Sequence, residues 1–396
     1  MLDLKDIRPT WVEINLENLA HNIKQVKQLI KKDTLLTAVV KANGYGHDSI
    51  EVSKVFLENG ADRLAVATLS EAIELRNGGI NNTPILILGY TPNSQFEELF
   101  KYNIIPTLYS YEQSESLSKI ALNKNQKIKI HIKIDTGMRR LGFESNDNSI
   151  KEILKISELP NIEVEGIFTH FAKADEKNKD FTRLQFKKFT YITNNLENKG
   201  LKIPIKHVSN SAAIIDLPEY NLDMVRAGIM LYGLYPSDSV DKKRVSLKAA
   251  MSLKTKLSHI KTIEKNEGIS YGHIYTTDKK TKIGTIPIGY ADGFSRILSN
   301  NVKLTIREKK VNLVGRICMD QSMIDLSDVI HPNIGDIVTI FSDGKKNTNS
   351  IDDIANKLGT INYEVVCMVA KRVPRVFLNK GNIIKIKDYN LHNMSI

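Results

Sequence analysis

The chain has 396 residues, 41% of them hydrophobic and 26% charged, which excludes wholesale disorder, a collagen-like repeat and a disulfide scaffold. Its formal net charge is +11, but the lysines are interleaved with acids along the whole chain, so a solvated surface explains them without a nucleic-acid partner. No apolar run approaches the roughly 20 residues that cross a bilayer, and the acidic start is unlike a signal peptide. We therefore expect a cytoplasmic protein with no membrane partner.

The first part of the chain repeats a strand-and-helix pattern. Eight short runs rich in apolar and β-branched residues predict strands, and segments with helical spacing lie between several of them. The predicted strands are 35–40, 64–68, 85–88, 104–109, 128–134, 164–171, 205–209 and 224–231, and the predicted helices are 51–59, 69–76, 112–122 and 181–199. Continuous apolar strands that alternate with helices are typical of buried parallel sheets. Eight such units favour a (β/α)8 TIM barrel over an open doubly wound sheet.

The pattern changes after about residue 235. Predicted strands at 245–265, 282–289, 302–306, 311–318 and 336–341 are separated by turn residues, and the clearest helical spacing is at 350–358. We therefore predict an α/β chain with a barrel over residues 1–240 and a mostly β domain over residues 241–396. Residues 1–15 contain a further strand, at 10–14, which can pair with either domain.

Lys41 ends the first predicted barrel strand. Active sites of barrel enzymes lie at the carboxyl ends of the strands. An amine that is partly desolvated there has a lowered pKa, and its neutral form can make a Schiff base. A lysine that merely extends its charged end into solvent fits the same position.

Other strand ends also carry polar groups. His170 follows the sixth strand, Ser211 opens a helix after the seventh, and Arg226 and Gly228 lie in the eighth. Each has an ordinary structural explanation, such as a core histidine or an ion pair. Together, however, a Schiff-base lysine, a small-residue phosphate cradle and an arginine on an opposing strand point to pyridoxal 5'-phosphate.

The segments around these residues resemble those of bacterial alanine racemases, over nearly the whole chain. In the first domain the similar segments are LTAVVKANGYGH at 36–47, KIDTGMRRLGF at 133–143, FTHFA at 168–172, NSAA at 210–213 and VRAGI at 225–229. In the second domain they are SYG at 270–272, PIGYADG at 287–293, GRICMDQ at 315–321, INYE at 361–364 and RVPR at 372–375. Such a series of motifs, in order and across two domains, is far more specific than any one of them.

The resemblance implies an amino-acid racemase, an isomerase that interconverts L-alanine and D-alanine by a two-base mechanism and needs pyridoxal phosphate but no metal. Lys41 would hold the cofactor and take the α-proton of D-alanine, and Tyr271 would be the opposing base for L-alanine. Arg226 would face the pyridine nitrogen with His170 supporting it. Because an arginine keeps its own proton, the ring nitrogen would stay unprotonated.

The resemblance also implies the remaining contacts. Arg140 and the backbone amide of Met319 would bind the substrate carboxylate. Lys133 matches a lysine that is often carbamylated in relatives, where it holds this arginine in place. The cofactor phosphate would be surrounded by Tyr45, Ser211, Gly228, Ile229 and Tyr363, and Tyr290 and Asp320 would have supporting roles.

Finally, the resemblance implies a homodimer with shared active sites, in which Tyr271 and Met319 of one subunit complete the barrel mouth of the other. The product, D-alanine, would serve peptidoglycan synthesis for the cell wall. The main alternative is a racemase for another small amino acid such as serine. A decarboxylase of the same barrel class has no need of the Tyr271 segment, and a pyridoxal-phosphate carrier without turnover has no need of the second domain.

Overall fold

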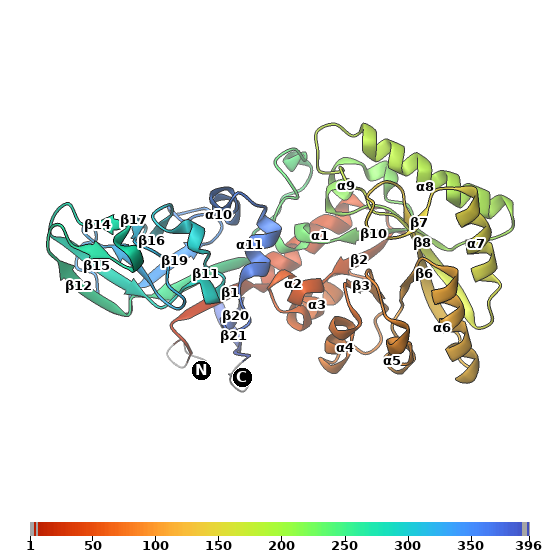
Figure 1. Ribbon diagram of the computed structural model, residues 1–396, viewed down its shortest axis with the longest axis horizontal. Helices are drawn as coiled ribbons and strands as arrows, with labels where there is room; N and C mark the ends of the chain where they lie inside the picture. Colours follow the sequence, from red (N-terminus) through yellow and green to blue (C-terminus); the bar gives the residue numbers. More distant parts are fainter. Residues whose placement is uncertain (1–3, 5–6, 390–393, 396) are drawn as a thin grey trace. The chain divides into compact units, whose positions relative to one another are not determined.

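The structure is a computed structural model that describes residues 4, 7–389 and 394–395. The chain divides into two compact units (Figure 1). The barrel unit comprises Ala20–Gly44 and Ser49–Leu247, and the β unit comprises Met1–Leu19, Tyr45–Asp48 and Lys248–Ile396. The predicted ranges are 1–240 and 241–396, with residues 1–15 able to pair with the second domain. The structure adds the short segment Tyr45–Asp48 to the β unit, which the prediction does not include.

Eight parallel strands form the core of the barrel unit, all of whose residues are described, and each lies at a predicted position. They are β2 (Leu35–Val39), β3 (Arg63–Val66), β4 (Ile85–Ile87), β5 (Thr107–Leu108), β6 (Ile128–Asp135), β8 (Ile162–Phe168), β9 (Ile205–His207) and β10 (Met224–Ala227). Two sheets, in the orders β10-β2-β3-β4 and β5-β6-β8-β9, meet where Leu86 and Ile105 form a parallel bridge. On the other side, the amide of Arg226 donates to the carbonyl of Ser209 at 3.1 Å. The strands thus close into the predicted (β/α)8 barrel.

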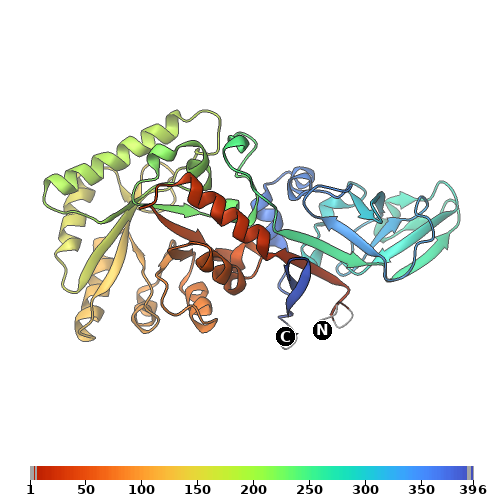
Figure 2. The same cartoon turned by 180° about the vertical axis from the view of Figure 1, so that it is seen from behind.

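Helices connect these strands, and Figures 1 and 2 show α3 to α8 on the outside of the barrel. They are α3 (Ser49–Glu58), α4 (Leu69–Asn77), α5 (Phe96–Lys101), α6 (Tyr111–Asn123), α7 (Asp147–Ser157), α8 (Asp180–Asn198) and α9 (Ser211–Asp216), after α1 (Leu16–Leu29) and the short turn α2 (Lys41–Tyr45). The short strand β7 (Phe143–Glu144) pairs with β6. Local residues decide where helices begin: Thr68 and Glu71 form a capping box at α4, and Ser110 and Asn146 cap α6 and α7.

The β unit contains an eleven-stranded sheet within the described part of the chain, in the order β12-β15-β18-β17-β16-β19-β11-β1-β20-β21-β22. Its strands are β1 (Thr10–Asn15), β11 (Met251–Lys256), β12 (His259–Ile263), β15 (Thr281–Ile286), β16 (Lys303–Ile306), β17 (Lys309–Val314), β18 (Ser322–Asp325), β19 (Ile337–Phe341), β20 (Arg375–Asn379), β21 (Asn382–Lys387) and β22 (Met394–Ser395). A hairpin of β13 (Gly268–Ile269) and β14 (Tyr275–Thr276) and two helices, α10 (Ile351–Leu358) and α11 (Asn362–Met368), complete it.

Three observations refine the predicted β unit. Strand β1 pairs antiparallel with β11 and parallel with β20, so the opening strand belongs to this sheet. The single strand predicted at 245–265 is two strands, because the chain leaves its partner β19 after Lys256 and pairs with β15 from His259 onward. Strands β18, β20 and β21 and helix α11 have no counterpart among the predicted elements. Of the helices that the structure describes, none has the length and apolar character to span a membrane.

Candidate active site

Lys41 lies at the carboxyl end of β2, where the chain makes a left-handed turn. Ala42, Asn43 and Gly44 have φ angles of 52°, 54° and 60°. The amide of Ala42 donates to the carboxylate of Glu71 at 2.7 Å, which anchors the turn to helix α4. A Cβ on Gly44 would lie 2.8 Å from the side chain of Val52, so a larger residue does not fit there. Strained backbone of this kind is characteristic of functional sites, and here it fixes the position of the lysine.

Arg226 projects from β10 into the barrel, where it is buried. Its Nη1 donates to Nδ1 of His207 at 2.7 Å, and its Nη2 donates to the carbonyls of Thr169 at 2.8 Å and Val208 at 3.0 Å. The Nδ1 atom of His170 lies 3.4 Å from Nη2. Burial lowers the pKa of Arg226 to about 9, so the guanidinium remains charged at neutral pH. The barrel therefore holds a fixed cation in its interior.

Lys133, in β6, is a second buried basic residue of the barrel interior. Its Nζ donates to the carbonyl of Ile134 at 2.9 Å and lies 5.2 Å from the centre of the Phe168 ring. Burial lowers the pKa of Lys133 to about 7, with repulsion from Arg226 adding to the effect. A large fraction of this amine is therefore neutral near pH 7.

His170 shows that the predicted barrel residues are close to one another. Burial lowers the pKa of His170 well below its usual value, and repulsion from four surrounding cations adds to this, namely Arg226, Arg140, Lys133 and Lys41. The loop that carries Arg140 folds around Asp135, which accepts hydrogen bonds from the amides of Gly137 at 2.8 Å and Arg139 at 3.1 Å. These four basic side chains therefore act on the electrostatics of one imidazole, which Arg226 contacts directly.

The predicted phosphate residues of the barrel unit also lie together. The hydroxyl of Ser211, the first residue of α9, accepts a hydrogen bond from the amide of Gly228 at 2.9 Å. Asn210 caps the same helix by accepting from the amide of Ala213 at 3.1 Å, which gives it an ordinary structural role. Ile229 follows Gly228 and is buried.

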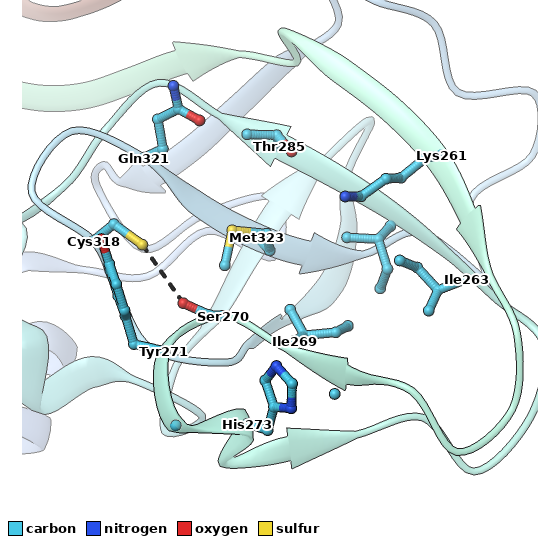
Figure 3. A pocket seen from close by; sticks show the side chains of 13 residues that line it. Lys261, Ile263, Ile269, Ser270, Tyr271, His273, Thr285, Cys318, Gln321 and Met323 are labelled. Carbon is cyan, nitrogen blue, oxygen red and sulfur yellow. Dashed lines mark hydrogen bonds between the residues drawn. The ribbon is translucent and has the colours of Figure 1, made fainter.

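Tyr271 lies on a strained turn of the β unit. Ser270 has a φ of 66° and His273 a φ of 43°, and both flank the turn that presents the tyrosine. The Tyr271 side chain is 68% exposed beside a cavity of about 580 Å³. Figure 3 shows this cavity, where the Ser270 hydroxyl lies 3.5 Å from the sulfur of Cys318. A rigid turn thus presents an exposed phenol.

The other predicted residues of the β unit form two further sets of contacts. The amide of Tyr290 donates to the carbonyl of Cys318 and the amide of Ala291 to that of Met319, both at 3.0 Å. Asp320 forms an ion pair of 2.6 Å with Arg372. Elsewhere in this unit the rings of Tyr45 and Tyr363 lie 6.2 Å apart. The structure therefore brings the predicted residues into two groups: Lys41, Lys133, Arg140, His170, Ser211, Arg226, Gly228 and Ile229 in the barrel unit, and Tyr45, Tyr271, Tyr290, Met319, Asp320 and Tyr363 in the β unit.

Sequence reasoning missed His207, which contacts Arg226 directly, and the residues His131 and Glu165 behind it. A signal for His131 exists in the alternation KIHIKID at 129–135. In a strand, residues two apart share a face, so Lys129, His131, Lys133 and Asp135 line one side and isoleucines the other. A buried strand with one polar face predicts a polar barrel interior.

The residues of the barrel unit suit an anionic cofactor that carries a carbonyl group. The amine of Lys41 can bond to such a carbonyl, while Arg140 and the buried Arg226 supply positive charge. Asp135 is the acid that counters the charge of Lys133. Pyridoxal phosphate, with its aldehyde, phosphate and basic ring nitrogen, fits this donor set. Among the described residues, no three His, Cys, Asp or Glu side chains are grouped as a metal site would need.

A lysine at the mouth of a (β/α)8 barrel, among buried basic side chains, defines a barrel protein whose interior suits an anionic cofactor. Residues 14–236 match the family model of the alanine racemase N-terminal domain, and residues 250–377 match that of the alanine racemase C-terminal domain. The chain belongs to the alanine racemase family, whose members are pyridoxal-phosphate-dependent isomerases.

Individual relatives match over nearly the full length. An alanine racemase of Clostridium tetani is 51% identical over 97% of this chain and 99% of its own length. One of Methanococcus maripaludis is 52% identical over 94% of this chain and 99% of its own. A solved alanine racemase of Clostridium difficile superposes with a TM-score of 0.95 at 47% identity, over 98% of this chain and all of that one. The predicted fold and family are confirmed.

Proposed function

We propose that this chain is a cytoplasmic alanine racemase that interconverts L-alanine and D-alanine and supplies D-alanine for peptidoglycan. The observation that carries the proposal is the placement of Lys41 on a strained turn at the barrel mouth, coupled through His170 to the buried guanidinium of Arg226. Pyridoxal phosphate, when bound, withdraws electrons from the substrate and so makes the α-proton of an amino acid removable.

Racemisation needs two proton-transfer groups, because the α-proton must leave one face of the α-carbon and return to the other. Lys41 would remove and return the proton on the D-alanine side, and Tyr271 would do so on the L-alanine side. The exposure of Tyr271 and the strain of the turn that carries it support a role in contact with substrate. Each group would contribute to the rate as a general acid and base.

The remaining residues would bind and orient. Arg226 would donate to the ring nitrogen of the cofactor without giving up its proton, since a guanidinium is a donor only. Arg140 and the amide of Met319 would bind the substrate carboxylate. Tyr45, Ser211, Gly228, Ile229 and Tyr363 would hold the phosphate, His170 would support Arg226, and Lys133, Tyr290 and Asp320 would support the site from farther away.

The purified protein, loaded with pyridoxal phosphate, should convert either isomer of alanine to an equal mixture of both, because the isomers have equal free energy in water. Chiral chromatography of samples started from each isomer measures this. Serine offered in parallel distinguishes the alternative, since a kcat/KM higher for serine than for alanine would assign the enzyme to that substrate. Conversion of neither amino acid would contradict the proposal.

We also infer that the active form is a homodimer whose sites are shared, with Tyr271 and Met319 of one copy completing the barrel mouth of the other. Both side chains are exposed on the β unit, at 68% and 53%, although tyrosine and methionine usually avoid such exposure. A surface that a second copy covers accounts for this.

Co-expression of two inactive variants should test the shared site. A hybrid of Lys41→Ala and Tyr271→Phe subunits should regain activity, because one of its two sites combines the intact Lys41 of one copy with the intact Tyr271 of the other. Differently tagged subunits allow the hybrid to be purified and its kcat compared with both parent variants. A hybrid as inactive as its parents would place both residues of each site on the same chain.

A further inference from the structure

A chain of hydrogen bonds crosses the barrel interior behind Arg226. Nη1 of Arg226 contacts Nδ1 of His207 at 2.7 Å, and Nε2 of His207 contacts Nδ1 of His131 at 2.9 Å. Nε2 of His131 then contacts the carboxylate of Glu165 at 3.1 Å. These residues come from four neighbouring strands, β10, β9, β6 and β8. The chain links the guanidinium at the site to a carboxylate deeper in the barrel.

The two ends of this chain determine where each proton lies. An arginine only donates hydrogen bonds and a carboxylate only accepts them. Nδ1 of His207 must therefore accept from Arg226, which places the ring proton on Nε2, and that proton is donated to Nδ1 of His131. His131 in turn carries its proton on Nε2 and donates it to Glu165. The opposite arrangement would set two donors against each other at Arg226.

Both imidazoles are neutral in these surroundings. Burial lowers the pKa of His207 well below its usual value, and repulsion from Arg226, Arg63 and Lys133 adds to this. Burial also lowers the pKa of His131, although its hydrogen bond with Glu165 opposes the effect. The ring of His207 stacks on Phe168 with centroids 4.6 Å apart and an angle of 8°. A neutral ring held in one plane has one donor and one acceptor, as the chain requires.

Glu165 is held as a charged acceptor at the far end. Its carboxylate pairs with Arg63 in a two-pronged contact and with Lys129 at 2.9 Å. Burial alone raises the pKa of Glu165, but the hydrogen bonds from His131, Arg63 and Lys129 outweigh it and hold the pKa far below the usual range. Arg63, Lys129 and Glu165 line a cavity of about 500 Å³, together with the residues that begin β6. This end of the barrel is opposite to the strand ends that carry Lys41.

We propose that Glu165 is a positioning residue for the cofactor. Through His131 it keeps Nδ1 of His207 as a hydrogen-bond acceptor, and this acceptor holds the Arg226 guanidinium in the orientation that the ring nitrogen of pyridoxal phosphate needs. The proposal rests on the role of Arg226 in the proposed function, and it extends the site across the barrel to a carboxylate that touches neither cofactor nor substrate. Arg226 at one end of the chain can only donate hydrogen bonds and Glu165 at the other end can only accept them. Only one set of proton positions on His207 and His131 therefore satisfies every hydrogen bond of the chain.

The wild-type holoenzyme allows a direct test by nitrogen NMR with ¹⁵N-labelled histidine, which reports the tautomer of each ring. Both His131 and His207 should be neutral with the proton on Nε2, and their signals are assigned with His131→Gln and His207→Gln variants. A charged ring, or a proton on Nδ1 of either residue, would overturn the proposal. This measurement does not depend on racemase activity, so it remains decisive even if alanine is not the substrate.

Two matched substitutions then test the effect on the cofactor. Glu165→Gln keeps the shape of the side chain but adds an amide donor, so His131 should populate a second tautomer. The dissociation constant of pyridoxal phosphate should then rise about tenfold, which is roughly the effect of losing one hydrogen bond to a charged group. Glu163→Gln is the control, because Glu163 lies two residues before Glu165 on the same strand, β8. The Glu163 side chain is 50% exposed, whereas that of Glu165 is 7% exposed, and a Glu163 carboxylate oxygen lies 3.9 Å from Nζ of Lys129, which also pairs with Glu165. It should change neither the tautomers nor the affinity.

Titration of the cofactor-depleted proteins gives the dissociation constants. An unchanged affinity in Glu165→Gln, or an equal loss in Glu163→Gln, would refute the positioning role, because the first would show no coupling and the second only a general effect of charge. If Glu165→Gln does not fold, the tautomers of the wild-type rings decide the question.

Discussion

Replacement of Lys41 with alanine should remove both the visible absorbance of the lysine-bound cofactor and the racemase activity. The loss of activity should exceed about 10⁴-fold, the upper end of what a general base contributes, because in the proposed function the same amine also holds the cofactor. The left-handed turn at Ala42–Gly44 keeps its geometry without the lysine side chain, so the fold should persist. Absorbance spectra before and after borohydride reduction, with chiral assay of alanine, measure both effects.

A second lysine of the barrel could also react with the cofactor aldehyde, so the site of attachment has to be identified. Lys133 is a neighbouring lysine whose pKa is lowered to about 7 by burial, so its amine is also able to react with an aldehyde near neutral pH. Peptide mapping of the reduced protein identifies the modified lysine. Attachment to Lys133 in the wild-type protein, or an absorbance band that survives in Lys41→Ala, would contradict the assignment. Lys54→Ala is a suitable control, since this half-exposed lysine of α3 forms an ion pair with Glu51 of the same helix.

Replacement of Tyr271 with phenylalanine should slow racemisation by about 10² to 10⁴-fold while leaving the absorbance of the bound cofactor unchanged. The substitution removes one hydroxyl from an exposed ring, so neither the turn nor the core of the β unit should be affected. The two isomers should differ in deuterium oxide: D-alanine should still exchange its α-proton through Lys41, whereas L-alanine should not. Proton NMR of the α-position measures both rates.

A nearby tyrosine provides the control for this substitution. Tyr275 packs against the core cluster of Ile269, Ile283 and Val314 rather than standing exposed. Tyr275→Phe should therefore leave both exchange rates at the wild-type values. Racemisation at the parent rate in Tyr271→Phe, or an equal loss in Tyr275→Phe, would remove Tyr271 from its assigned role.

The barrel was predictable because its strands are buried on both faces and read as continuous apolar runs, of which LLTAV in β2 is an example. The β unit was less predictable for the same physical reason. Strand β12 exposes most of its residues, so its apolar pattern does not separate it from β11 within the predicted strand at 245–265. Strand β21 is partly exposed along its length and presents no clear apolar run. Helix α11 has no side-chain cap to mark its start.

The residues of the candidate site also differ in how well the sequence alone predicts them. Lys41, Arg226 and Tyr271 stand within short contiguous motifs, so the amino-acid sequence alone is enough to select them. His207 and Glu165 could not be selected in that way, because their importance arises from contacts between strands that are 34 to 76 residues apart along the chain. Alternation on β6 indicated a polar interior, but only the closed barrel identifies the partner of each polar group.

The loop that follows Lys41 also limits how this protein can be taken apart or recombined. Tyr45–Asp48 belongs to the β unit, although Lys41 and Ser49 on either side belong to the barrel unit. In the β unit the Asp48 carboxylate pairs with Lys387 at 2.5 Å, and the carbonyl of Gly46 accepts from Arg375 at 3.1 Å. A single cut near residue 247 therefore cannot yield a self-contained barrel fragment. Chimaeras of two relatives would need to exchange this loop together with the second half of the gene.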